Sequence, residues 1–138
     1  DPDALEAMID ARTRAVVLIA TVAIAVAVNL VVAAVATAVG APAGFPALSA
    51  PALITFTVLP LTVGGFVWQA IAARVRRPGR TLLTLAAIVF VVSLVPDLIL
   101  LATGFIPGTN LTAVVGLMTA HAVVLGAAVI GYTAALRR

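Results

Sequence analysis

The sequence predicts an all-α membrane protein: a four-transmembrane-helix bundle of up-down-up-down topology, with the N and C termini both cytoplasmic. Three observations lead to this prediction. The 138 residues are 64% hydrophobic and only 9% charged, with a mean hydropathy of +1.28, whereas about a quarter of residues are charged in soluble domains. Four long apolar runs are separated by short polar or Pro- and Gly-rich segments. The Arg residues lie only at the ends of these runs.

Residue usage also excludes several classes of protein. The chain has no cysteine, so disulfide scaffolds, thiolate metal sites and cysteine nucleophiles are excluded. The sequence pI of about 11.2 indicates contact with anionic lipid and not with nucleic acid, because the basic residues all flank apolar runs. All eight basic residues are Arg. With the heavy use of Ala and Val, this bias indicates a GC-rich bacterial genome and predicts an inner-membrane protein.

Apolar length and helix-breaking residues divide the chain. Each span is long enough, at about 1.5 Å per residue, to cross a hydrocarbon core of about 30 Å. The outer loops lack charge and are rich in Pro or Gly, while the inner segments contain Arg. The expected order is a cytoplasmic interfacial lead-in helix (1–14), the first span (15–39), an outer loop (40–51), the second span (52–73), a basic cytoplasmic turn (74–80), the third span (81–103), an outer loop (104–110), the fourth span (111–136) and a cytoplasmic end (137–138).

Individual residues support these boundaries. The first span resembles a secretory signal at its ends, but its apolar run exceeds the roughly 7 to 15 residues of such a signal. Pro60 is expected to kink the second span, and Trp68 to anchor its end among lipid headgroups. Thr109 or Asn110 is expected to cap the fourth helix. For Asn110 we prefer this role over the glycosylation sequon that it begins.

The distribution of charge predicts the orientation in the membrane. If the chain crosses four times, every Arg falls on one side and the loops on the other side have no charge, which is the positive-inside pattern. Short loops are expected to make successive helices antiparallel neighbours. The residues expected at the cytoplasmic lipid surface are Arg12, Arg14, Arg74, Arg76, Arg77, Arg80, Arg137 and Arg138.

A carboxylate lies within the third span, where Asp97 is the only acidic residue after Asp10. An acid at that depth costs roughly 2.5 to 3.5 kcal/mol on insertion scales and is expected to have a partner. One polar residue in each other span, Asn29, Thr57 and His121, lies at the same level. Each is about 15 to 17 residues from the nearest Arg, which places it about 22 to 25 Å from the cytoplasmic edge. The sequence therefore predicts a single buried cluster with one polar group from each span.

Within this cluster, Asp97 and His121 form the natural pair. A carboxylate and an imidazole can share one proton in a charge-assisted hydrogen bond and then titrate together. Asn29 and Thr57 can satisfy the remaining donors and acceptors. No metal site or cofactor is predicted, because two ligands are fewer than zinc needs, and no catalytic motif is present. Met118, one turn from His121, is interpreted as core filler.

Three functions fit these residues. The preferred one is a binding or transport module whose cluster binds a proton, an ion or a lipophilic small ligand. The alternative is a structural or accessory subunit of a larger membrane complex, because interhelical polar contacts also serve as packing glue. The third is an intramembrane acid–base enzyme acting on a lipid-soluble substrate. A homo-oligomer or a membrane-protein partner is expected. Small residues recur at Ala20, Ala23, Ala27 and Ala34 in the first span and at Gly116, Ala120, Ala127 and Ala134 in the fourth. These faces are candidates either for packing within this bundle or for docking another subunit.

The same residues also resemble a known family. The four Ala- and Val-rich spans include Asn29 in the first, an Arg-rich turn at 74–80, Leu94-Val95-Pro96-Asp97 in the third and Met118-Thr119-Ala120-His121 in the fourth. Together they resemble an uncharacterised family of small four-span bacterial inner-membrane proteins, a domain of unknown function. The resemblance covers nearly the whole chain and implies the four-helix architecture. It assigns no activity and no functional residue.

Overall fold

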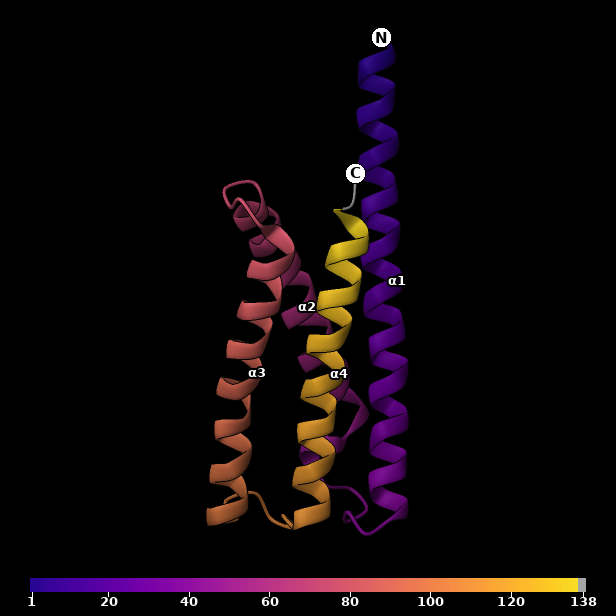
Figure 1. Cartoon of the computed structure of the whole chain (residues 1–138). Helices are drawn as coiled ribbons and strands as arrows, with labels where there is room; N and C mark the ends of the chain where they lie inside the picture. Colours follow the sequence, from indigo (N-terminus) through magenta and orange to yellow (C-terminus); the bar gives the residue numbers. More distant parts are fainter. Residues whose placement is uncertain (137–138) are drawn as a thin grey trace.

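The computed structural model describes residues 1–136 and contains four long α-helices (Figure 1). No strand occurs within this part of the chain. All four helices are long and apolar enough to cross a membrane, so the predicted all-α, four-helix membrane fold is confirmed. The predicted lipid-surface residues Arg137 and Arg138 lie outside the described residues. The elements are α1 (Pro2–Ala38), a short 3-10 helix η1 (Pro46–Leu48), α2 (Ala50–Ala72), α3 (Pro78–Thr103) and α4 (Leu111–Ala135).

The first helix is longer than a single membrane span. Asp1 caps its start, because the Asp1 carboxylate accepts a hydrogen bond of 3.2 Å from the Asp3 backbone N–H. The predicted lead-in at 1–14 is the first part of α1 and not a separate interfacial helix, because no Gly or Pro interrupts residues 3–38. In Figure 1 this part of α1 extends beyond the other three helices. The second helix likewise continues through Pro60.

The fourth helix lies at the centre of the bundle. It packs against α1, α2 and α3, whereas α3 contacts α1 and α2 marginally at most. Figure 1 shows the helices running alternately up and down, so that α1 begins and α4 ends at the same end of the bundle. The successive helices α2 and α3 therefore approach each other little along their backbones, although Trp68 of α2 and Leu82 of α3 share one apolar cluster. Short loops define the direction of a helix but do not determine which helices pack together.

Small residues allow α1 and α4 to approach closely. A Cβ atom added to Gly116 would lie 3.0 Å from Ala36 Cβ, and one added to Gly131 would lie 2.9 Å from Thr21 Cβ. Such approach maximises the van der Waals contact that associates helices in lipid. The α1 face in this contact includes the buried Ala25, Ala33 and Ala36, while the predicted face, Ala20, Ala23, Ala27 and Ala34, is exposed. On α4, Gly116 and Ala120 are buried, Ala127 is partly buried and Ala134 is exposed.

One apolar cluster contains the single tryptophan. Trp68 is buried with Leu61, Leu82 and Tyr132, so its indole is a core group and not the headgroup anchor that we predicted. The Tyr132 hydroxyl donates a hydrogen bond of 2.5 Å to the Leu61 carbonyl. Gly64 makes room for this bond, because a Cβ atom there would lie 2.8 Å from the Tyr132 oxygen. Tyr132 was not among the residues singled out from the sequence, and the adjacent pair Gly64-Gly65 on α2 is the signal that could have found its contact.

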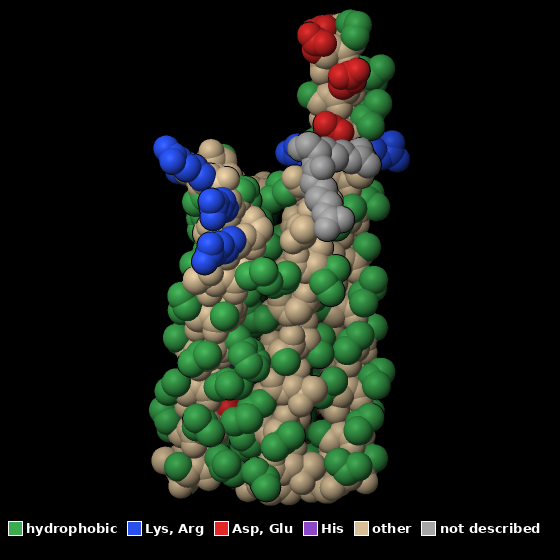
Figure 2. Space-filling model, in the orientation of Figure 1, with side chains coloured by type: hydrophobic (Ala, Val, Ile, Leu, Met, Phe, Trp, Pro, Cys, Tyr) green, Lys and Arg blue, Asp and Glu red, His purple; other side chains and the backbone are tan. Residues whose placement is uncertain are grey.

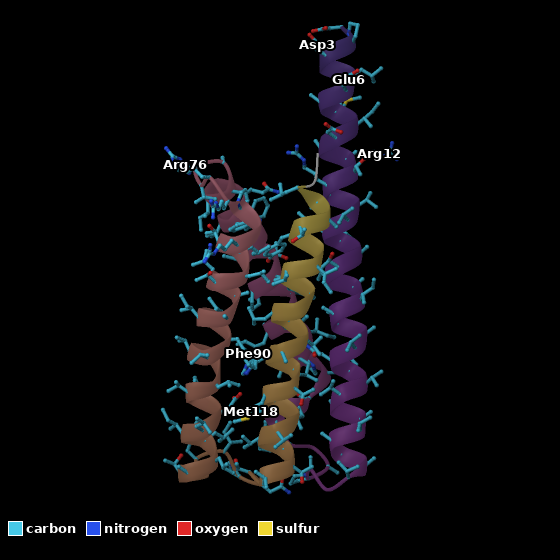
Figure 3. The ribbon with its side chains drawn as sticks, viewed as in Figure 1. Asp3, Glu6, Arg12, Arg76, Phe90 and Met118 are labelled. Carbon is cyan, nitrogen blue, oxygen red and sulfur yellow. The ribbon has the colours of Figure 1, made fainter. Side chains whose placement is uncertain are left out.

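Charged side chains gather at one end of the molecule. Figure 2 shows most charged side chains of the visible face at the end where α1 begins, while the sides are largely apolar apart from one small acidic patch toward the other end. Figure 3 places Arg12 and Arg76 at this same end, with Asp3 and Glu6 farther out on the extension of α1. The loops at the opposite end have no charged residue. This separation of charge along the bundle matches the pattern expected from the sequence.

The two loops at the uncharged end are joined by Asn110. Its side-chain oxygen accepts a hydrogen bond of 2.8 Å from the Ala113 backbone N–H, which caps α4. Its side-chain nitrogen donates a hydrogen bond of 2.8 Å to the Gly40 carbonyl. The predicted cap is confirmed, and the same amide ties the α3–α4 loop to the end of α1.

Candidate functional site

An ionisable pair joins α3 to α4. Asp97 Oδ2 lies 2.8 Å from His121 Nδ1, and the two side chains are 8% and 36% exposed. Both atoms are shielded from solvent and have no aligned hydrogen bond with any described group. The distance suits a hydrogen bond, but the direction of the ring N–H does not, so the contact is an ion pair when His121 is protonated. The structure thus brings together Asp97 and His121, the pair predicted from the sequence.

The local sequence of α3 leaves Asp97 dependent on its neighbour helix. Pro96 has no N–H, so the carbonyl of Val92, four residues earlier, receives no hydrogen bond from that position. The hydroxyl of Ser93, one turn before Asp97, donates a hydrogen bond of 2.7 Å to the Phe90 carbonyl. Ser93 is therefore engaged within its own helix, and His121 on α4 supplies the polar contact of the carboxylate.

The two nitrogens of the His121 ring have different surroundings. Nδ1 of His121 faces Asp97, whereas Nε2 has no partner in the described part of the chain. Met118, one turn earlier on α4, is partly buried against the apolar cluster that includes Leu100 and Val114, and Figure 3 labels it beside the space between α3 and α4. It packs as the predicted core filler. His121 is therefore the polar group through which this pair is reached from outside the bundle.

A second polar pair joins α1 to α2. Asn29 Nδ2 donates a hydrogen bond of 2.9 Å to Thr57 Oγ1, and both residues are 1% exposed. The other amide atom, Asn29 Oδ1, is shielded and has no partner. Among residues 1–136 no hydrogen bond joins this pair to Asp97 or His121. The predicted single cluster is therefore two separate pairs, because α3 packs on α4 and does not bring Asp97 to α1 or α2.

The basic residues form a separate surface at the charged end of the bundle. Arg76, Arg77 and Arg80 line a hollow of about 520 Å³. Arg74 donates a hydrogen bond of 2.8 Å to the Ala70 carbonyl and so satisfies a backbone group at the end of α2. Their predicted contact with lipid, like that of Arg12 and Arg14, stays a prediction.

The pair and its surroundings limit the chemistry that this site can perform. No three His, Cys, Asp or Glu side chains in the described residues are placed so that they could hold a metal ion together, and Asp97 with His121 offers two donors where zinc takes three or four. A carboxylate beside an imidazole can bind a proton and pass it between the two groups. A hydrogen-bonding group of a ligand can also contact the free Nε2.

Comparison with known proteins places the chain in a family. Neither the curated proteins nor the solved structures give a significant match. A family model matches residues 9–138, a range that contains α2, α3 and α4 and most of α1. This match agrees with the resemblance described from the sequence. The chain therefore belongs to the family of unknown function DUF6069.

Proposed function

We propose that Asp97 and His121 form a proton-binding site within the membrane, and that the protein is a small binding or transport module built around it. The observation that supports this most directly is the 2.8 Å contact between a buried carboxylate and an imidazole. An ionisable residue inside a span is expensive and is usually paired and functional. The free Nε2 of His121 is the point at which a polar group of a lipophilic ligand would bind.

The proposed site lies in the outer half of a bacterial inner membrane, with both chain ends in the cytoplasm. Support comes from the charge: Arg residues lie at one end of the bundle and the opposite loops have none, which is the positive-inside arrangement. Asp97 is then about 25 Å from the Arg-bearing edge, counted from Arg80 at the helical rise. We assign Asn29 and Thr57 a structural role, since their hydrogen bond ties α1 to α2 and reaches neither Asp97 nor His121.

The proposal is tested by infrared titration of the carboxyl C=O band in the purified protein. Asp97→Asn is expected to remove one titrating band, and His121→Ala to shift the midpoint of that band, because the two groups titrate as a pair. Ser93→Ala is the matched control, because its hydroxyl lies one turn from Asp97 on the same helix and bonds only within that helix. A spectrum that is unchanged in Asp97→Asn, or a midpoint indifferent to His121, would refute the proposal.

A second candidate is an accessory subunit of a membrane complex or a homo-oligomer. The observation in its favour is the exposed row of small residues on α1, which includes Ala20, Ala27 and Ala34. Small faces let helices from another subunit approach closely. Ala27→Phe is expected to reduce co-purification of a partner or to lower the oligomeric state, with no change in the titration of Asp97. The two candidates are therefore separable by experiment.

A further inference from the structure

A long groove runs between α1 and α2 and belongs to neither polar pair. Its volume is about 900 Å³, and its wall is formed by apolar side chains that include Leu18, Val22 and Val26 of α1 and Val58, Leu61 and Phe66 of α2. We call this cavity the α1–α2 groove. On α1 the lining residues recur every three or four positions, so one face of the helix forms one wall of the groove along its whole length.

The length and opening of the groove suit an extended hydrocarbon chain. Its lining runs from Ala11 to Val26 on α1 and from Gln69 to Ile54 on α2, which is about 22 Å along each helix at the helical rise. Phe66 on its wall is 70% exposed, so the groove opens sideways. In a membrane that side faces lipid, and an occupant enters from the bilayer without crossing water.

One end of the groove is polar and cationic. Arg14 and Gln69 line it there, at the end of the bundle where Arg12 and Arg76 also lie (Figure 3). The Nε atom of Arg14 is shielded from solvent and has no hydrogen-bond partner among the described residues. An N–H donor that is shielded and unsatisfied is costly, and a guanidinium presents its donors in a fork that matches phosphate oxygens.

We propose that the α1–α2 groove binds one anionic phospholipid, with an acyl chain along the apolar wall and the phosphate at Arg14. The charge supports an anionic headgroup, because residues 1–80, whose charged side chains all lie toward this end, include six Arg against four acidic residues. The apolar wall supports a lipid and not a soluble anion. This inference is independent of the proton site, which lies between α3 and α4.

The headgroup contact is tested by native mass spectrometry of the intact protein in neutral detergent, titrated with phosphatidylglycerol or with phosphatidylcholine. The wild type is expected to retain one phosphatidylglycerol more tightly than phosphatidylcholine. Arg14→Gln is expected to weaken phosphatidylglycerol binding about fivefold, the effect of one basic residue at an anionic lipid surface. Arg12→Gln removes the same charge two residues away, outside the groove, and is expected to have a smaller effect. Equal losses in the two variants, or no preference for phosphatidylglycerol, would overturn the proposal.

The acyl-chain contact is tested by filling the groove. Ala23 lines the groove, whereas Ala20, on another face of α1, does not. Ala23→Phe is expected to abolish retention of the bound lipid, and Ala20→Phe to leave it unchanged. Circular dichroism of both variants would report whether the helices are retained. If Ala23→Phe retains the bound lipid, the groove is not the lipid site and the proposal is wrong. If this variant also changes the oligomeric state, the occupant of the groove is a second copy of the chain.

Discussion

Contact between α1 and α4 depends on the absence of a side chain at Gly131. A Cβ atom there would lie 2.9 Å from Thr21 Cβ and closer still to Thr21 Cγ2 and Oγ1. Rotation of the Thr21 side chain would not relieve this contact, because its Cβ is fixed to the backbone. The Thr21 hydroxyl also donates a hydrogen bond of 2.8 Å to the Val17 carbonyl, which rotation would break. Gly131→Ala is therefore expected to force α1 and α4 apart.

The size of the effect is the difference between two opposing contributions. Inserting a methyl group into a packed interface typically costs about 1 to 3 kcal/mol, while replacing Gly by Ala inside a helix stabilises it by roughly 0.5 to 1 kcal/mol. Gly131→Ala is then expected to lose about 1 kcal/mol of the free energy of unfolding. Gly126→Ala is the matched control, because no atom lies within 4 Å of its added Cβ. Gly126→Ala should show only the stabilisation that comes from replacing Gly by Ala inside a helix.

The measurement is unfolding of each variant in mixed micelles with increasing SDS, followed by circular dichroism. The stability difference between the two variants removes the helix contribution and is expected to be about 1 to 3 kcal/mol. Thr21→Ala combined with Gly131→Ala should recover part of the loss, because two of the three opposing atoms are then absent. Equal stability of Gly131→Ala and Gly126→Ala, or strict additivity with Thr21→Ala, would refute this account of the interface.

Two further predictions concern hydrogen bonds and use the same unfolding measurement. Asn29→Leu and Thr57→Val, made singly and together, are expected to show a coupling free energy of about 0.6 kcal/mol and no more than about 1.7 kcal/mol, because the bond between them is buried; additive losses would contradict it. Asn110→Ala is expected to cost about 1 kcal/mol for the lost cap and more for the lost bond to Gly40. Asn110→Asp keeps the cap oxygen but not the amide donor, so it should be intermediate; a stability equal to that of Asn110→Ala would contradict a capping role.

Helix number and membrane character were predictable from the sequence because they depend on local quantities. Apolar length decides whether a run can cross a bilayer, and Pro, Gly and Asn110 mark the ends of the runs. The lead-in at 1–14 was separated from the first span on polarity alone. Polarity does not end a helix, and without a Gly or Pro the backbone continues through Arg12 and Arg14.

Which residues face one another was only partly predictable. Counting residues from the nearest Arg estimates depth, and the chemistry of a carboxylate and an imidazole then paired Asp97 with His121. That pair forms because α3 and α4 are in contact. The same count placed Asn29 and Thr57 at that depth but contained no information on which helices pack together. Ala is so frequent in α1 that spacing did not identify its buried face. Asn29 marks that face, since a polar amide avoids lipid.

The attachment of α3 determines how the two roles of the ionisable pair can be separated. Because α3 packs mainly on α4, loss of His121 would weaken this interface whether the pair serves for packing or for proton binding. Asp97→Asn distinguishes the two roles, because the amide has nearly the same size and keeps an oxygen acceptor for His121 but cannot take up a proton. If the pair serves only for packing, Asp97→Asn should retain both the stability of the protein and any activity measured for it. If the pair binds a proton, stability should be retained while every proton-coupled activity is lost, whereas loss of the carboxyl band is expected in both cases.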